Sequence, residues 1–269
     1  MRNFYAPSSP LPLDQADGLR RLFAGNALRV LPVAANPYVP HVGGAGVVLD
    51  RVAAALAAAG RRVLVVDAGS GAPPAHEMAR VDLAAGIERI APRVGYLAAA
   101  GLPLAFVDTR GSAAAFIDVL QEAAPWADTV LLHAEPAELA RVLVRRDCRP
   151  LLLGADHPES IKHAYAACKL LVQRCALMTF DLLLAAAPHS PRLDAIAASL
   201  ARCADNFLGA YLHEWAVIDP AGDAAGESTA TRALHDLVQA QIHLGLPFAA
   251  SAVAARPAAT ARTAVPSFR

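Results

Sequence analysis

Lysine, aromatic residues and paired cysteines are scarce in this sequence. Acidic and basic residues balance at 24 each, which excludes the broad electrostatic field that would attract nucleic acid or anionic lipid. The four cysteines, at positions 148, 168, 175 and 203, have no Cys-x-x-Cys spacing. We therefore expect buried free thiols, neither metal ligands nor disulfides.

Long apolar runs are also missing. No uncharged run approaches the roughly 20 residues that a membrane-spanning helix needs, and residues 1–5 lack the apolar core of a signal peptide. These absences predict a cytoplasmic location. The apolar content of 55% is largely alanine, a strong helix former, and so indicates a helix-rich α/β protein.

What the chain does contain is a regular alternation of short apolar runs and amphipathic segments. Strands are predicted at 28–34, 62–67, 102–108, 129–133, 150–154, 180–184 and 216–218. Helices are predicted at 47–59, 113–124, 136–146, 161–174, 191–206 and 232–244. This alternation predicts one three-layer α/β domain with a mostly parallel sheet.

A loop rich in glycine and proline follows the first predicted strand, where free backbone amides at a helix N-terminus can bind an anion. Residues 40–48 read Pro-His-Val-Gly-Gly-Ala-Gly-Val-Val. One interpretation is a P-loop ATPase; another is a dinucleotide site, with Gly44 and Gly46 and with Asp67 about twenty residues on. Leu49 stands where the dinucleotide motif has its third glycine, so this second signal is weak.

The N-terminal residues 13–20 read Leu-Asp-Gln-Ala-Asp-Gly-Leu-Arg. This stretch resembles the N-terminal activating helix of FlhG, a family of MinD-like ATPases that regulate flagellar number and placement. A helix over 15–23, capped by Asp14, would carry the apolar stripe Ala16, Leu19 and Phe23. The resemblance implies that this helix contacts the FlhF GTPase and promotes its GTP hydrolysis. It assigns partner binding to Asp14, Gln15, Ala16, Leu19, Arg20 and Phe23.

A second match, residues 156–169, resembles the FlhG pattern Pro-x-x-[Ser/Thr]-x-x-x-Ala-Tyr-Ala-x-x-Lys. We expect Ser160 to cap this helix. The resemblance allows Tyr165 to lie near a nucleotide or dimer face, and an ordinary core position is the alternative. It runs from residue 13 to about residue 220 and implies a P-loop NTPase fold of MinD type.

The ATP-handling residues of that family are replaced in this chain. MinD-type loops read Lys-Gly-Gly-x-Gly-Lys-[Ser/Thr], and alignment on the glycines puts Val47 and Val48 at the last two positions. No alignment supplies a lysine, because Lys162 and Lys169 lie far along the chain. These losses remove the charge compensation that a triphosphate needs.

Two acidic positions of the family are also changed. Gly69 stands where the second aspartate of the first switch motif belongs, and His133 stands where the magnesium-organising aspartate belongs. A competing alignment would give the latter role to Asp108, at the end of the predicted strand 102–108. If a polar pocket remains, its residues are Gly43, Gly44, Gly46, Asp67, Asp108 and His133.

The sequence therefore predicts a partner-binding tail at residues 1–26, a MinD-like α/β domain at 27–249 and a disordered tail at 250–269. We expect a non-catalytic FlhG-like regulator acting on FlhF, with no cofactor, possible homodimerisation and no nucleic-acid partner. The helix over 232–244 is too weakly basic for a convincing lipid anchor. The alternatives are an active ATPase that binds ATP and magnesium through an unusual loop and, with less support, a dinucleotide-binding oxidoreductase.

Overall fold

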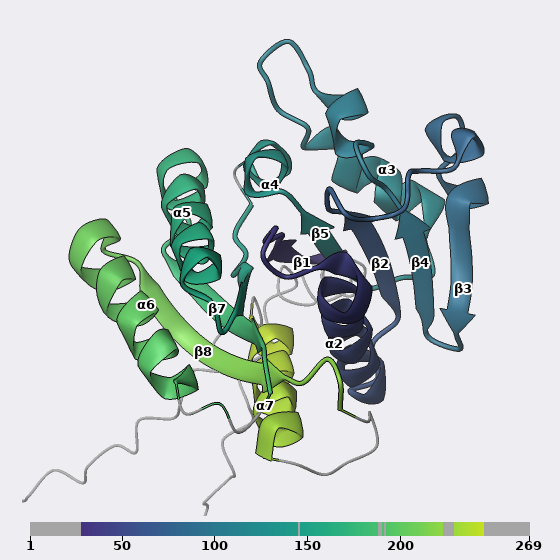
Figure 1. Cartoon of the computed structure of the whole chain (residues 1–269). Coiled ribbons are helices and arrows are strands. Elements are labelled where there is room, and N and C mark those ends of the chain that lie inside the picture. Colours follow the sequence, from purple (N-terminus) through teal and green to yellow (C-terminus); the bar gives the residue numbers. More distant parts are fainter. Residues whose placement is uncertain (1–27, 145, 188–189, 191, 223–228, 245–269) are drawn as a thin grey trace, which may run out of the picture.

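A computed structural model describes residues 28–144, 146–187, 190, 192–222 and 229–244. Within them, one sheet has the strand order β3-β4-β2-β5-β1-β6-β7-β8 and helices on both faces (Figure 1). The strands are β1 (Arg29–Ala34), β2 (Val63–Ala68), β3 (Ile87–Ala91), β4 (Val94–Ala98), β5 (Thr129–Ala134), β6 (Leu151–Ala155), β7 (Thr179–Ala185) and β8 (Tyr211–Ile218). The helices are α2 (Gly46–Ala58), α3 (Ala115–Ala123), α4 (Pro136–Val142), α5 (Pro158–Cys175), α6 (Leu193–Leu208) and α7 (Thr229–His243).

All strand pairs are parallel except β3–β4. Their carboxyl ends therefore share one edge of the sheet, as the alternation of strands and helices predicted. The α/β class with a mostly parallel sheet is confirmed.

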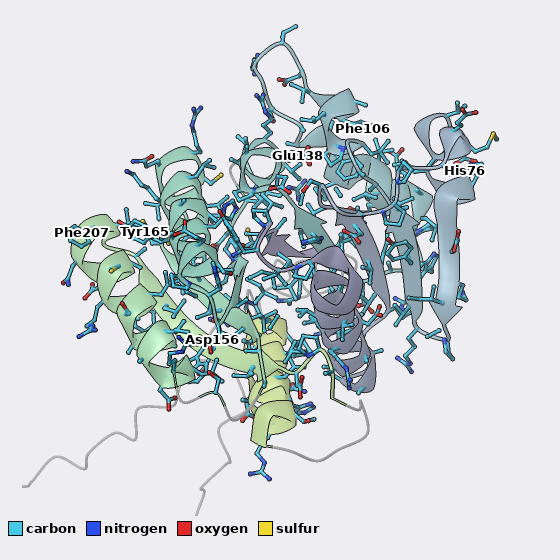
Figure 2. All side chains as sticks on the ribbon, viewed as in Figure 1. His76, Phe106, Glu138, Asp156, Tyr165 and Phe207 are labelled. Atoms are coloured by element: carbon cyan, nitrogen blue, oxygen red, sulfur yellow. The ribbon has the colours of Figure 1, made fainter. Side chains whose placement is uncertain are left out.

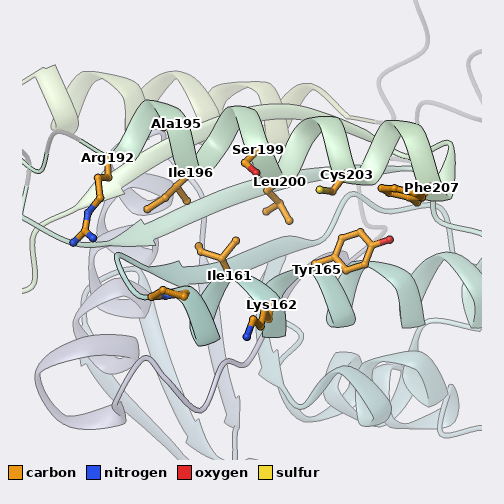
Figure 3. A pocket seen from close by; sticks show the side chains of 11 residues that line it. Ile161, Lys162, Tyr165, Arg192, Ala195, Ile196, Ser199, Leu200, Cys203 and Phe207 are labelled. Carbon is orange, nitrogen blue, oxygen red and sulfur yellow. The ribbon is translucent and has the colours of Figure 1, made fainter.

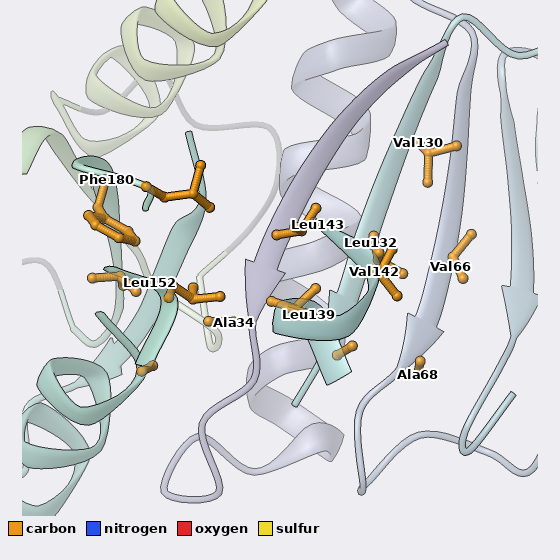
Figure 4. Close-up of a cluster of buried hydrophobic side chains, with 14 of the residues drawn as sticks. Ala34, Val66, Ala68, Val130, Leu132, Leu139, Val142, Leu143, Leu152 and Phe180 are labelled. Carbon is orange, nitrogen blue, oxygen red and sulfur yellow. The ribbon is translucent and has the colours of Figure 1, made fainter. Parts of the chain in front are cut away.

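Buried side chains form two hydrophobic layers, one on each face of the sheet. On one face α2 and α7 pack through residues such as Val48, Leu49 and Val238. On the other face α3–α6 pack on alternate strand residues, and Figure 4 shows Leu139 and Val142 of α4 in one cluster with Leu132 of β5 and Val66 of β2. Strands buried on both faces explain why their sequences read as continuous apolar runs.

The predicted strand at 102–108 is wrong. Residues Pro103–Phe106 form a short 3-10 helix, and the sheet instead contains the antiparallel hairpin of β3 and β4, which the sequence reading missed. A short apolar run does not distinguish a buried strand from a buried helical turn, and Pro103 at the first helical position favours the turn.

The start of α5 also differs from expectation. Ser160 does not cap it, because the helix begins at Pro158 and the Nδ1 atom of His157 accepts the amide of Glu159 at 3.2 Å. The Ser160 hydroxyl is buried and accepts the amide of Ala155 at 2.9 Å. The predicted helix of residues 15–23 and the tail from 250 lie outside the described residues. Among the described helices, none has the length and apolar character needed to cross a membrane.

Candidate functional site

The loop that follows β1 lies at the carboxyl edge of the sheet, where ligands bind in folds of this type. Asn36 is buried and fixes the start of this loop. Its side-chain amide donates to the carbonyl oxygens of Leu153 at 2.8 Å and Ser160 at 2.9 Å. Its side-chain oxygen accepts the amide of Tyr38 at 3.1 Å. The first turn of the loop is therefore tied to β6 and α5.

The glycine-rich segment of this loop is wound into a helical turn, His41–Ala45, that runs directly into α2. The amide of Ala45 donates to the carbonyl oxygen of Pro40 at 2.8 Å, so this amide is used within the turn. Gly43 has a φ of +71°, a backbone conformation that favours glycine. A Cβ on Gly44 would lie 3.3 Å from side-chain atoms of Val39 and Pro40, so this turn is tightly packed.

Asp67 and His133 form a buried pair beside the loop. The Oδ1 atom of Asp67 lies 2.7 Å from the Nδ1 atom of His133, and both residues are almost fully buried. The Tyr96 hydroxyl donates to Asp67 Oδ2 at 3.4 Å. Burial, followed by the Asp67 carboxylate, raises the pKa of Tyr96 well above its usual range, so the hydroxyl stays protonated and available to donate.

Gly69 and His133 have complementary shapes. A Cβ on Gly69 would lie 2.5 Å from Cε1 and 2.9 Å from Nδ1 of His133, closer than such atoms can approach. The imidazole ring therefore occupies the space that a side chain at position 69 would need. The glycine at position 69 and the histidine at position 133 are thus linked by packing.

A small pocket of about 200 Å³ lies between the loop and this pair. Its lining residues are Ala35, Asn36, Pro37, Val39, Pro40, Ala45, Ser70, Gly71, His133 and Glu135. The volume is below the roughly 300–1,000 Å³ of sites that enclose drug-sized ligands. Among the described residues, the lining includes the Glu135 carboxylate and no lysine or arginine. No group of three or more potential metal ligands occurs among the described residues.

The chemistry of the Asp67–His133 pair is limited by its surroundings. An aspartate that accepts from Nδ1 of histidine can orient the ring as a general base through Nε2. Here Nε2 is buried and has no hydrogen-bond partner among the residues that the structure describes. Asp67 therefore holds the imidazole ring in place, and the buried Nε2 atom is not accessible to a substrate.

The structure brings only some of the expected site residues together. Gly43 and Gly44 lie in the turn leading into α2, Gly46 is the first residue of α2, and Asp67 and His133 form the pair beside the turn. Asp108 is separate, because the segment before it is not a strand. Its Oδ1 atom accepts the amides of Arg110 and Ser112 at 2.9 and 2.8 Å, and it lines another pocket that shares no residue with the first. Asp108, which the competing alignment assigns to the nucleotide site, therefore does not line the first pocket.

Sequence reasoning missed Asn36 and Tyr96 as parts of this site. The sequence signal for Asn36 was an asparagine two residues after the first predicted strand. Tyr96 lies on β4, a strand that was not predicted. Tyr165 lies in a groove between α5 and α6 and does not line the small pocket. The expected partner-binding residues 14–23 lie outside the described residues.

Comparisons with known proteins point to one fold. No protein-family model and no curated protein matches the sequence. Among solved structures, a ParA family ATPase from Chlorobium tepidum is similar over 80% of this chain and 98% of its own, with 16% identity and a TM-score of 0.51. A plasmid partition protein from Borrelia burgdorferi bound to AMPPNP is similar over 80% and 98%, with 9% identity and a TM-score of 0.52.

A third similar structure comes from the MinC:MinD cell division complex of Aquifex aeolicus. It covers 81% of this chain and 97% of its own, with 12% identity and a TM-score of 0.50. At these identities the comparisons establish the fold, which is the α/β fold of ParA and MinD proteins.

Proposed function

We propose that this chain is an FlhG-like regulator with a ParA/MinD fold, that it does not hydrolyse ATP, and that it acts on an FlhF-type GTPase. The observation that carries the loss of catalysis is the buried Asp67–His133 pair, which fills the edge of the sheet beside the glycine-rich turn. The imidazole ring of His133 takes the place of a magnesium-organising carboxylate in the alignment with the family.

Charge and space support this proposal. Phosphoryl transfer in P-loop enzymes depends on a lysine and on Mg²⁺ that neutralise the developing charge. In the part of the chain that the structure describes, the small pocket has no lysine or arginine and contains a carboxylate instead. Aliphatic Val47 and Val48 lie in the first turn of α2, and Val48 is fully buried in the core. A triphosphate at this position would therefore lack its main electrostatic partners.

The positive part of the proposal rests on the N-terminal residues. The stretch from Asp14 to Arg20 carries the resemblance to the FlhG activating helix, with Gln15, Leu19 and Arg20 as the contact residues. The MinD neighbour was solved in a complex with MinC, which supports partner binding as a use of this fold. Loss of ATP handling together with retention of this helix is consistent with regulation by contact alone.

Calorimetric titration of the full chain with ATP and ADP in the presence of Mg²⁺ tests the nucleotide half. We expect no binding at millimolar nucleotide, because the cations of the site are missing. Micromolar ATP binding would instead support an active ATPase, the alternative favoured by the nucleotide-bound fold neighbour. A parallel titration with NAD tests the dinucleotide alternative, which predicts binding that depends on Asp67.

The partner half is tested by GTP turnover of an FlhF-type GTPase with and without the full chain. We expect the chain to raise the turnover rate, and Gln15→Ala and Arg20→Ala to reduce this effect. An Arg269→Ala variant serves as a control, because it changes a charge at the other end of the chain. Failure of the wild-type chain both to bind and to stimulate the GTPase would overturn the proposal.

A further inference from the structure

A long apolar groove runs between the parallel helices α5 and α6 on the outside of the domain. Its volume is about 720 Å³. Its apolar floor and walls come from both helices, and Figure 3 shows these side chains facing one another across it. The main contributors are Ile161, Tyr165, Ile196, Leu200, Cys203 and Phe207. We call this feature the α5–α6 groove.

Phe207 is the clearest sign that the α5–α6 groove is uncovered in the described residues. Its side chain is 76% exposed, although burial of a phenylalanine side chain contributes about 1.5–3 kcal/mol. Figure 2 places Phe207 and Tyr165 on adjacent helices at the same side of the molecule. An exposed aromatic residue at the end of an apolar groove is typical of an interaction surface.

We propose that residues 14–23 of the same chain dock in the α5–α6 groove as an amphipathic helix. This segment carries the stripe Ala16, Leu19 and Phe23 at helical spacing, and an apolar stripe of this kind binds in a groove between helices. The regulatory meaning rests on the proposed function: the docked helix is withheld from the GTPase until the GTPase competes for it.

The position of β1 determines how the segment would reach the groove. The helices α5 and α6 follow parallel strands, so their first residues lie at the carboxyl edge of the sheet and their last residues at the amino edge. Phe207 is therefore at the amino edge, where β1 also begins at Arg29. The six Cα–Cα steps from Phe23 to Arg29 can span at most about 20–22 Å. The strand β7 is two positions from β1, about 10 Å away in the plane of the sheet, and a helix docked on α5 and α6 lies a further distance of about 8–10 Å beyond their layer. The linker must therefore be almost fully extended.

This connection also sets the direction and register of the docked helix. Its C-terminal end must lie at the amino edge, so the helix runs parallel to α5 and α6. With Phe23 beside Phe207, equal helical rise places Leu19 at the level of Cys203 and Ala16 at the level of Leu200. The apolar stripe then follows the line of apolar residues along α6.

Charge distinguishes this segment from the other end of the chain. Asp14 and Asp17 would lie in the half of the groove that contains Lys162, whose exposed ion pair with Glu159 is weak and easily exchanged. Residues 245–269 contain three arginines, at 256, 262 and 269, and no acidic residue. That tail has no carboxylate that could approach Lys162, so it fits the groove less well.

Disulfide formation in the full chain tests the docking. In a Leu19→Cys variant, mild oxidation should form an intramolecular bond with Cys203, mapped by mass spectrometry. We expect the bond to form at least about tenfold faster than in Arg21→Cys, because docking places the thiol at a high effective concentration. Arg21 is the matched control, since it lies on the opposite side of the predicted helix. Cys203→Ser should abolish the bond.

The outcomes separate the docking from the proposed function. Equal rates for Leu19→Cys and Arg21→Cys, or bonds only between two chains in dilute solution, would overturn the docking. A bond to a cysteine other than Cys203 would overturn the register and the groove as the site. An FlhF-type GTPase added with GTP should slow formation of the bond. If the bond forms rapidly and the GTPase has no effect, the docking stands and competition by this GTPase fails.

Discussion

Asp67 and His133 are direct neighbours in register on the parallel strands β2 and β5 and are joined by a hydrogen bond of 2.7 Å. The pair lies at the carboxyl edge of the sheet, where the polar end of each strand meets the loop after β1. Because the imidazole ring also covers Gly69, three positions of the site depend on one another. A substitution at any one of these positions should therefore disturb the packing of the other two.

Gly69→Ala should destabilise the protein by about 1–3 kcal/mol, the usual cost of inserting a methyl group into a packed interior. The new Cβ would lie 2.5 Å from Cε1 of His133, and the ring cannot move without losing its bond to Asp67. The measurement is the free energy of unfolding in urea for Gly69→Ala, His133→Ala and the double variant. We expect the double variant to be less destabilised than the sum of the singles; strict additivity would contradict the packing link.

Arg149→Met should destabilise the protein by about 3–5 kcal/mol, because it leaves a buried carboxylate without its cation. Arg149 Nε lies 2.9 Å from Asp181 Oδ2, and both side chains are almost fully buried. Gln241 of α7 also donates to Asp181, so the same cluster holds α7 on the sheet. The measurement is equilibrium unfolding in urea.

A surface ion pair provides the control for Arg149. Arg146 lies 3.3 Å from Asp118 at exposed positions, and such pairs contribute about 0.2–1 kcal/mol. Arg146→Met should therefore change the free energy of unfolding by no more than this amount. Similar losses for both variants would show that burial of the Arg149–Asp181 pair has no special role.

Much of the fold could be predicted because its strands are buried on both faces. Continuous apolar runs identified β1, β2, β5, β6 and β7, and the intervening amphipathic segments identified the helices. The secondary-structure predictions were wrong where the apolar residues follow no regular period. Within residues 102–108 the chain forms the short helix Pro103–Phe106. The missed strand β3 carries exposed charged residues such as Glu88 and Arg89, which hide its pairing with β4.

The position of the candidate site at one edge of the sheet could be predicted from the ends of the strands. The contacts between its side chains could not. Asp67 and His133 both end predicted strands, so their proximity at one edge follows from a parallel sheet. The direct bond between them depends on β5 lying next to β2, which is a matter of strand order. Asp108 was misplaced with its strand. The tight fit between Gly69 and the His133 ring is a three-dimensional property that no local pattern carries.

Asn36→Ala should destabilise the protein by about 1–3 kcal/mol, the cost of leaving buried backbone groups without partners. The groups are the carbonyl oxygens of Leu153 and Ser160 and the amide of Tyr38. Asn36→Asp should cost more at neutral pH, because it places a carboxylate oxygen against two carbonyl oxygens. Unfolding in urea at pH 7 checks the order of the variants; a more stable aspartate variant would contradict the donor role of the Asn36 amide.

Glu138→Gln should stabilise the protein at neutral pH and leave it unchanged in acid. Burial, followed by the nearby Glu135 carboxylate, raises the pKa of Glu138, and its Oε2 atom is buried with no hydrogen-bond partner in the described part of the chain. A raised pKa means that the folded state binds the proton more tightly than the unfolded state, whose pKa is about 4.3. The stabilisation by this group is therefore complete below that value and is lost as pH rises through the folded pKa.

Glutamine has no such titration, so the wild-type and Glu138→Gln melting temperatures should diverge as pH rises from about 4 toward 7. The position of Glu138 in the first turn of α4 acts in the opposite direction, since the helix N-terminus favours a carboxylate; the raised pKa indicates that burial outweighs this effect. Glu135→Gln is the matched control, because it removes the neighbouring charge and should lower the pKa of Glu138 without removing the buried group. A Glu138→Gln protein that melts below wild type at pH 7 would mean that the helix N-terminus dominates.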